Sequence, residues 1–227
     1  MRGAMVVLSL ALTACASRPI SLATGPRSLT PEDYEDVYEA WTRSEEDFEW
    51  STLSEVLRVT ATFESWEFRW AYVVRYASDY ALTGETRNAL LRASLDDAQE
   101  NHRFFITLAG DRFRDQDLSR PNSAWRVILV DPDGRQTEPV AVERVRRSTA
   151  AERTYFPTIN VHRQAFRVVF PAAHSDGTPT IPPNTDTIRL RFAGALGRVD
   201  VVWRFESSGS SGGEESTASS PAPASTL

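Results

Sequence analysis

The chain has 227 residues, with 25 basic and 31 acidic side chains and a net charge of −6. A charged fraction of 25% is typical of a soluble globular body, and the acidic balance argues against a nucleic-acid partner. Every basic residue is an arginine, so the chain has neither a Schiff-base lysine nor a phosphate-loop lysine. The composition predicts one globular domain without those two chemistries.

The first fifteen residues contain the parts of a secretory signal. Arg2 is the only charge there, and an apolar run at residues 5–11 leads to small residues before Cys15. The run is too short to cross a bilayer, which takes roughly 20 apolar residues. Cys15 is the only cysteine of the chain, so it forms no internal disulfide. The sequence Leu12-Thr13-Ala14-Cys15 resembles the lipobox of bacterial lipoprotein signal peptides.

This resemblance implies that residues 1–14 are a signal peptide and that Cys15 carries lipid as the first mature residue. Diacylglycerol and palmitate on Cys15 would anchor the protein to a membrane, because each buried methylene contributes about 0.8 kcal/mol. Ala16 and Ser17 follow without an aspartate, which in Gram-negative lipoproteins implies the outer membrane. Whether the protein faces the periplasm or the exterior stays open. Plain secretion without lipid is the alternative.

Composition divides the rest of the chain into three parts. Residues 15–28 are polar and contain glycine and proline, which predicts a tether. Residues 29–206 predict a single globular domain. Residues 207–227 consist largely of Ser, Gly, Pro, Ala and Thr, which predicts a disordered tail.

Hydrophobic periodicity predicts three helices, at residues 31–47, 65–82 and 85–101. Thr30 is expected to cap the first helix, since a proline and two acids follow it. In residues 65–82 a helical pattern competes with strand-like alternation. We prefer the helix because its pattern persists over the whole stretch. Thr83 is expected to cap the third helix.

Alternation between apolar and polar side chains predicts seven strands separated by turn signals. Asp131-Pro132-Asp133-Gly134 is expected to turn the third strand back onto the fourth, and residues 194–197 to close the last hairpin. Residues 154–160 predict a loop or short strand. The fold class is therefore α+β, with N-terminal helices and a β-sandwich, for which an immunoglobulin-like arrangement is one possibility. The strands are expected at residues 52–63, 103–109, 125–130, 138–145, 164–170, 187–192 and 198–205.

Two acidic segments are candidate cation sites. Asp111, Asp115 and Asp117 share one loop, and their oxygens would suit a hard cation, although a solvated acidic loop is the interpretation we favour. The turn at residues 131–134 begins like a calcium loop. Its glycine comes too early for an EF-hand, so an ordinary turn is favoured. No metal ligand is predicted.

The sequence singles out no catalytic group. His102, His162 and His174 do not stand at metal-ligand spacing, and neither H-E-x-x-H nor G-x-S-x-G is present. His102 follows the third helix, where a positive imidazole would suit the helix dipole. A lipidated Cys15 is unavailable as a nucleophile. Paired carboxylates for glycan hydrolysis are compatible with the many acids, but no pair stands out, so no catalytic residue or cofactor is predicted.

Two clusters are candidates for binding. Arg144, Arg146 and Arg147 stand together on the fourth strand and could meet lipid headgroups or an anionic polymer such as lipopolysaccharide; a solvated strand end is the alternative. An aromatic stripe on the second predicted helix could form a ligand platform, but core packing is favoured. The stripe consists of Phe68, Tyr72, Tyr76 and Tyr80.

The order of aromatic and turn residues carries a second resemblance. It includes V-T-A-T-F-E-S at residues 59–65, W-x-V-x-L at residues 125–129, and Phe-Pro at residues 156–157 and 170–171. This order resembles uncharacterised lipoproteins of GC-rich Gram-negative bacteria such as myxobacteria, over about residues 55–205. Such positions specify a fold, so no catalytic residue carries over.

We therefore predict a membrane-anchored lipoprotein of the cell envelope, a non-enzymatic binding or assembly module. Its expected partners are the membrane, through Cys15, and an envelope protein. The alternatives are an envelope-glycan hydrolase and a lipoprotein that binds a metal or a small ligand.

Overall fold

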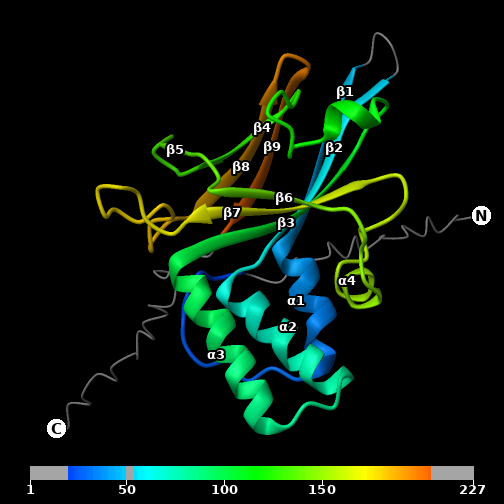
Figure 1. The fold of residues 1–227 in the computed structure, drawn as a ribbon. Helices are drawn as coiled ribbons and strands as arrows, with labels where there is room; N and C mark the ends of the chain where they lie inside the picture. Colours follow the sequence, from blue (N-terminus) through cyan, green and yellow to red (C-terminus); the bar gives the residue numbers. More distant parts are fainter. Residues whose placement is uncertain (1–19, 50–53, 206–227) are drawn as a thin grey trace, which may run out of the picture.

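The computed structural model describes residues 20–49 and 54–205. Within these residues the chain forms four α-helices and two antiparallel sheets, the predicted α+β class with a sandwich-like packing of the sheets (Figure 1). The helices are α1 (Tyr34–Trp41), α2 (Trp66–Asp79), α3 (Gly84–Glu100) and α4 (Ala150–Tyr155), with short 3₁₀ turns η1 (Pro31–Asp33) and η2 (Phe113–Gln116). The strands are β1 (Thr42–Glu49), β2 (Ser54–Phe63), β3 (Asn101–Ala109), β4 (Arg126–Val130), β5 (Gln136–Thr137), β6 (Ala141–Val145), β7 (Gln164–Pro171), β8 (Thr187–Gly194) and β9 (Gly197–Arg204).

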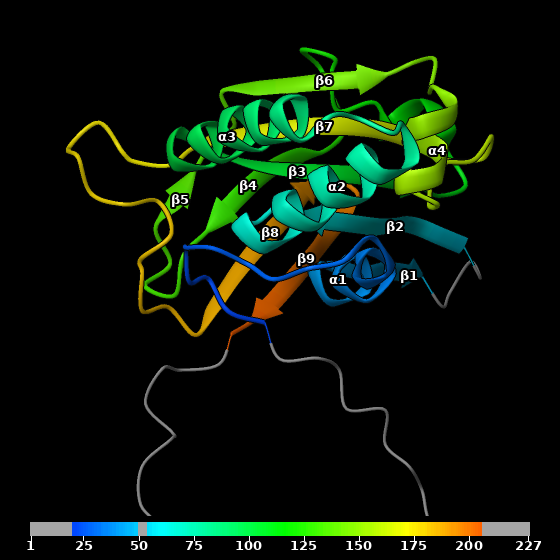
Figure 2. The ribbon, with the colours of Figure 1, turned by 90° about the horizontal axis from the view of Figure 1, so that it is seen from below.

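The larger sheet has the strand order β1-β2-β3-β7-β6, and the smaller sheet has the order β5-β4-β8-β9. Three strands that are consecutive in sequence, β1, β2 and β3, are therefore neighbours in one sheet. This order differs from that of immunoglobulin domains. Figure 2 shows α1, α2 and α3 together on one side of the strands, with both ends of the described chain below β9.

The larger sheet is covered on both faces. Phe104 and Phe105 are consecutive in β3, so they point to opposite faces. The Phe104 ring lies 5.5 Å from that of Trp203 in the smaller sheet, whereas Phe105 stacks 4.0 Å from Phe156, which directly follows α4. Both phenylalanines are buried. The core therefore continues from the space between the sheets to the space under the helices.

The first helix is shorter than the sequence predicted. α1 ends at Trp41, and residues 42–47, which were expected to be helical, belong to β1. β1 pairs with β2 from Thr42 opposite Thr62, and the hydroxyls of these two residues lie 2.8 Å apart. The prediction was wrong because the acidic residues of this segment are also compatible with an exposed helix face. In the structure the backbone of the segment forms its hydrogen bonds with β2 instead, as an edge strand.

The second and third helices confirm the predictions made from the sequence. Ser65 caps α2 by accepting a hydrogen bond from the Phe68 amide at 3.2 Å, and Thr83 caps α3 through the Thr86 amide at 3.2 Å. Arg69 of α2 is 5% exposed and donates to the Ser94 carbonyl of α3 at 2.9 Å. The two helices are thus held together by a buried guanidinium as well as by apolar contacts.

Residues 136–145 do not form the simple hairpin return that the sequence predicted. The 131–134 turn is confirmed, since the Gly134 amide donates to the Asp131 carbonyl at 3.1 Å. After it, β5 pairs briefly with β4, and β6 then joins β7 in the other sheet. Pro139 explains the switch, because a residue without an amide hydrogen cannot extend a strand ladder.

Helix α4 was missed by the sequence analysis, which placed a loop or short strand at residues 154–160. Thr149 accepts from the Glu152 amide at 3.1 Å, and Glu152 accepts from the Thr149 amide at 2.7 Å. This capping box is visible in the sequence as Thr-Ala-Ala-Glu. It was the signal that could have predicted the helix.

The ends of the chain are only partly described. The proposed signal peptide, Cys15 and the predicted tail at residues 207–227 lie outside the described residues. Of the predicted tether, residues 20–28 form neither helix nor strand; Ile20 is buried, and Trp66 donates to the Gly25 carbonyl at 2.8 Å. No helix among the described residues is long and apolar enough to cross a membrane.

Candidate functional site

A cleft with a volume of about 890 Å³ lies where the segment after η2, the end of β6, α4 and the start of β7 meet. Five guanidinium groups line it, against one carboxylate, that of Asp117, which gives a formal charge of +4. The chain as a whole carries −6, so this charge is a local reversal. The five arginines are Arg120, Arg144, Arg146, Arg153 and Arg163.

Asp117 is buried and is fully engaged by donors. Its Oδ1 accepts from the amide and the hydroxyl of Ser119 at 3.1 and 2.6 Å, and its Oδ2 accepts from Arg144 at 2.9 Å. Arg120 lies 3.5 Å from Oδ2. Burial raises the pKa of this carboxyl, but the Ser119 hydrogen bonds and the two guanidinium charges lower it below its usual value. Asp117 therefore stays ionised and positions arginines at the cleft wall.

Two further arginines are fixed by neutral acceptors. Arg163 donates through Nη1 to the Thr60 hydroxyl at 3.0 Å and to the Thr107 hydroxyl at 3.4 Å. Arg153 of α4 donates to the Ser148 hydroxyl at 3.2 Å. Neither contact neutralises the guanidinium charge, because hydroxyls carry none. Both side chains keep N–H groups for an incoming acceptor.

Arg146 is exposed and makes no hydrogen bond or ion pair with the described residues. Of the arginine cluster identified in the sequence, Arg144 and Arg146 line the cleft, whereas Arg147 is exposed but does not line it. Arg120, Arg153 and Arg163 were not predicted, since they stand in separate segments. Only the fold brings them together.

The structure separates the three aspartates of the predicted acidic loop. Asp117 lines the cleft, whereas Asp111 and Asp115 do not. Among the described residues, no group of three or more His, Cys, Asp or Glu side chains is placed to hold a metal ion. The second acidic segment, residues 131–134, forms a turn, in which Asp131 Oδ1 accepts a hydrogen bond from the Arg135 amide at 2.8 Å.

His102 directly follows the C-cap of α3, as the sequence predicted, but it already belongs to β3, and its ring packs edge-on against Phe63 at 6.0 Å. Burial, together with the nearby charge of Arg69, lowers its pKa to about 4. The imidazole is neutral at neutral pH, so the prediction of a positive charge favoured by the helix dipole was wrong.

The aromatic stripe of α2 mainly packs inside the protein. Phe68 is buried, and the Tyr72 and Tyr76 rings stack 6.0 Å apart, whereas Tyr80 is 52% exposed. The stripe continues to Tyr155 of α4, whose ring lies 5.1 Å from that of Tyr72. This agrees with the favoured interpretation of core packing.

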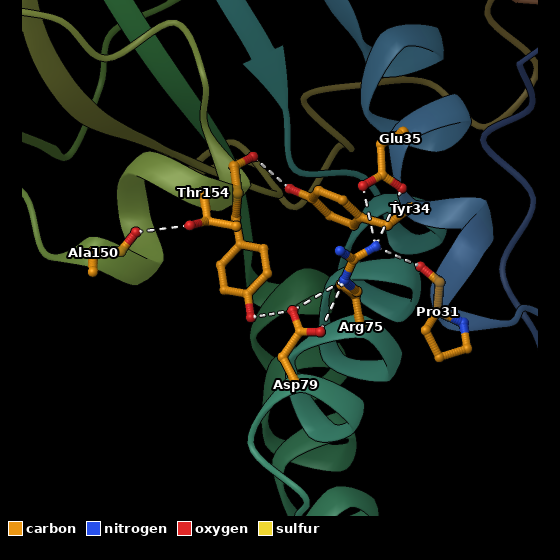
Figure 3. Close-up of polar contacts among 8 residues, drawn as sticks. Pro31, Tyr34, Glu35, Arg75, Asp79, Ala150 and Thr154 are labelled. Carbon is orange, nitrogen blue, oxygen red and sulfur yellow. Dashed lines mark hydrogen bonds and ion pairs between the residues drawn. The ribbon is translucent and has the colours of Figure 1, made fainter.

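Hydrogen bonds lock the same region at the junction of α1, α2 and α4 (Figure 3). Tyr34 donates to the Tyr155 carbonyl at 2.6 Å, and Tyr155 donates to Asp79 at 2.9 Å. Arg75 bridges Asp79 and Glu35 at 3.0 and 3.1 Å. Burial raises the pKa of the Tyr34 hydroxyl, which keeps it a neutral donor. The junction fixes α4, and therefore Arg153, relative to the helices.

A second pocket of about 330 Å³ is lined by α2, α3, β3, β7 and Phe156. It contains the carboxyl groups of Glu64 and Asp97. Asp97 accepts from Arg69, Arg103 and Asn101, at 2.5, 2.5 and 3.1 Å. Burial raises the pKa of Asp97, but these hydrogen bonds and charges lower it overall.

The pKa of Glu64 is shifted in the opposite direction. Its carboxylate forms no hydrogen bond or ion pair with the described residues. Desolvation raises its pKa, and the charges of Arg69, Arg167 and Arg103 only partly offset that effect. The two carboxyl groups of this pocket therefore differ in protonation behaviour. Sequence reasoning missed both of them, because nothing in the sequence distinguishes them from the many solvated acids.

Comparison with known proteins assigns the chain to no family, because no protein-family model, no curated protein and no solved structure matches it.

Proposed function

We propose that the protein is a lipoprotein of the cell envelope that is anchored through Cys15 and acts as a non-enzymatic binding module. Its arginine-lined cleft binds a phosphate-bearing envelope component, such as a lipid headgroup or lipopolysaccharide. The observation that carries the proposal is the concentration of five guanidinium groups around one carboxylate on a chain of net charge −6.

The chemistry of the cleft supports a phosphate group as ligand. A guanidinium offers several N–H donors in one plane and pairs with phosphate oxygens in a bidentate manner. Arg146 has no partner among the described residues, and Arg153 and Arg163 are held only by hydroxyl groups or a carbonyl. The volume of about 890 Å³ falls within the range of small-molecule sites. A headgroup can therefore enter with its charge paired on several sides.

The binding experiment uses the full chain and paired ligands that differ only in phosphate. Lipopolysaccharide and its dephosphorylated form are titrated against the protein, as are phosphatidylglycerol and phosphatidylcholine vesicles. We expect binding only to the phosphate-rich lipopolysaccharide and the anionic vesicles, and weaker binding as salt is raised. Equal binding to the charged and uncharged members of each pair would contradict the proposal.

The anchor has its own test, because it lies outside the described residues. In cells, Cys15→Ser should abolish incorporation of labelled fatty acid and move the protein from the membrane fraction to the soluble fraction. A variant that stays in the membrane fraction without lipid would show that residues 12–15 are not a lipobox. This outcome would leave the binding experiment unaffected.

The hydrolase is the second candidate function, and the Glu64–Asp97 pocket is the observation that favours it. An acid with a raised pKa beside an acid with a lowered pKa is the arrangement that assigns acid and base roles in glycosidases. Three donors already engage Asp97, which favours binding over nucleophilic attack. Release of soluble fragments from peptidoglycan, abolished by Glu64→Gln, would establish the hydrolase. No release would remove it.

A further inference from the structure

The backbone of Glu64 is fixed while its side chain is left free. Its amide donates to the Arg103 carbonyl at 2.9 Å, and its carbonyl accepts from Arg69 Nε at 2.9 Å. Ser65, the next residue, is the cap of α2. The strand end, the helix start and a buried arginine thus hold Glu64 in one place, and its carboxyl group faces the second pocket without a partner among the described residues.

The other charged groups lining this pocket are paired. Asp97 is bonded to Arg69 and Arg103, and Arg167 donates to Glu152 at 2.6 Å. Arg103 is nevertheless incompletely satisfied, since its buried Nε has no acceptor in the described part of the chain. The pocket therefore offers one accessible acceptor, the half-buried Glu64 carboxylate, and one buried donor without an acceptor, Arg103 Nε. A buried donor usually has a partner, so the Arg103 donor beside an open carboxylate points to a ligand.

The remaining wall of the pocket is apolar and largely aromatic. It is formed by Phe68 and Tyr72 of α2, Leu90 and Ala93 of α3, and Phe156. Leu90 is 36% exposed, so this part of the apolar wall is open to solvent. A ligand with one apolar face would cover this wall while its polar edge meets Glu64. The volume of about 330 Å³ suits a small ring and lies at the lower end for ligand sites.

The charges around the pocket bear on the kind of ligand that suits it. Three guanidinium groups and two carboxylates line the pocket, and Glu152 outside the lining pairs with Arg167, so three positive and three negative charges balance. The charge of the site as a whole therefore favours neither a cation nor an anion. A neutral ligand with hydroxyl groups suits such a site, because a hydroxyl can donate to Glu64 and accept from an arginine.

We propose that the pocket between α2 and α3 binds a neutral hydroxylated ring, a monosaccharide unit. Two hydroxyl groups donate to the Glu64 carboxylate, and the C–H face of the ring packs on the aromatic wall. This site shares no lining residue with the arginine cleft, so it stands independently of the proposed anion binding, whereas the hydrolase named as second candidate would use this same pocket. Together the two sites would read the sugar and the phosphate of an envelope glycolipid separately.

The test is saturation-transfer NMR and calorimetric titration of the full chain with neutral monosaccharides: glucose, galactose, mannose, N-acetylglucosamine and N-acetylmuramic acid methyl ester. We expect at least one to bind, and Glu64→Gln to weaken it by about tenfold or more, since a hydrogen bond to a charged group is lost. Glu85→Gln, on the exposed start of α3, is the matched control and should bind as the wild type does. Folding is checked by thermal unfolding of each variant.

The outcomes are separable. Glu64→Gln should not lower the melting temperature, because it removes a carboxylate that burial destabilises; binding lost at unchanged stability supports the site. Failure of every sugar to bind, equal affinity in Glu64→Gln, or binding of methylammonium in place of sugars would overturn the proposal. Arg146→Glu should leave sugar binding unchanged, so failure of the arginine cleft is distinguished from failure of this pocket.

Discussion

Arg144 Nη1 lies 2.9 Å from Asp117 Oδ2, and this contact joins β6 to the segment after η2 in the lining of the arginine cleft. Asp117 is buried and its pKa is lowered, so the contact is an ion pair at neutral pH. The same carboxylate engages Ser119 and Arg120. One acid therefore organises two of the five arginines without neutralising the cleft.

Asp117→Asn should lower the free energy of unfolding at neutral pH by about 1–3 kcal/mol, because it removes a charged acceptor from buried donors. A carboxyl with a lowered folded-state pKa stabilises the fold above its unfolded value, near 4, and this contribution is lost as pH falls through the folded value. The gap between variant and wild type should therefore narrow in acid. Urea unfolding at pH 7 and pH 3 measures it, and an equal gap at both would contradict the ion pair.

His102 predicts a second pH dependence with a different window. Its folded-state pKa of about 4 is below the unfolded value of about 6.5, so the unfolded chain binds the proton more tightly. Stability should be complete above pH 6.5 and fall by up to about 3 kcal/mol as pH drops to 4. His102→Leu should flatten the curve of unfolding free energy in this window. A curve with the wild-type slope would show that other groups cause the loss.

Thr149→Ala should destabilise the fold by about 1 kcal/mol, because the Thr149 hydroxyl caps α4. Thr154→Ala is the control within the same helix, where the hydroxyl only donates back to the Ala150 carbonyl, and it should change stability by less than about 0.5 kcal/mol (Figure 3). Thermal unfolding compares the two. Equal effects would show that the cap does not stabilise α4.

Two glycine substitutions should have opposite signs. A Cβ on Gly194 would lie 1.9 Å from the Ala124 carbonyl oxygen, so Gly194→Ala should destabilise by about 1–3 kcal/mol or more. A Cβ on Gly84 would meet nothing within 4 Å, and Gly84 lies in the first turn of α3. Gly84→Ala should stabilise by up to about 1 kcal/mol. Unchanged stability of Gly194→Ala would contradict the close approach of Gly194 to the Ala124 carbonyl, and loss of stability in Gly84→Ala would contradict the expected gain in α3.

Local patterns predicted those parts of the fold that local interactions decide. Residues 65–82 were assigned as a helix from periodicity, and Ser65 and Thr83 cap α2 and α3 through contacts within one turn. The same reasoning failed for residues 42–47, because their conformation is set by pairing with β2. β6 was assigned to the wrong partner for the same reason: the strand beside it, β7, lies about twenty residues further along the chain.

The candidate sites were predictable only in part. Arg144 and Arg146 stand close in sequence and were identified. Arg163 was missed because its side chain is held at the cleft by hydroxyl groups of β2 and β3, which are remote from it in sequence. Glu64 carried no local signal at all. Its distinction is the absence of a partner, which depends on how α2, α3 and β3 pack around it. Whether a carboxyl group has a partner is decided by tertiary packing, which the local sequence does not specify.

The most direct test of the proposed function compares a double charge reversal of exposed arginines in the cleft with a single reversal of an exposed arginine beside it. Arg146→Glu combined with Arg153→Glu changes two arginines that line the cleft, whereas Arg147→Glu changes an adjacent arginine that does not. Affinity for lipopolysaccharide is measured by calorimetric titration at fixed salt. We expect the double variant to bind at least about tenfold more weakly than wild type and Arg147→Glu to stay within about threefold of it. Equal affinities of the double variant and wild type would contradict anion binding in the cleft.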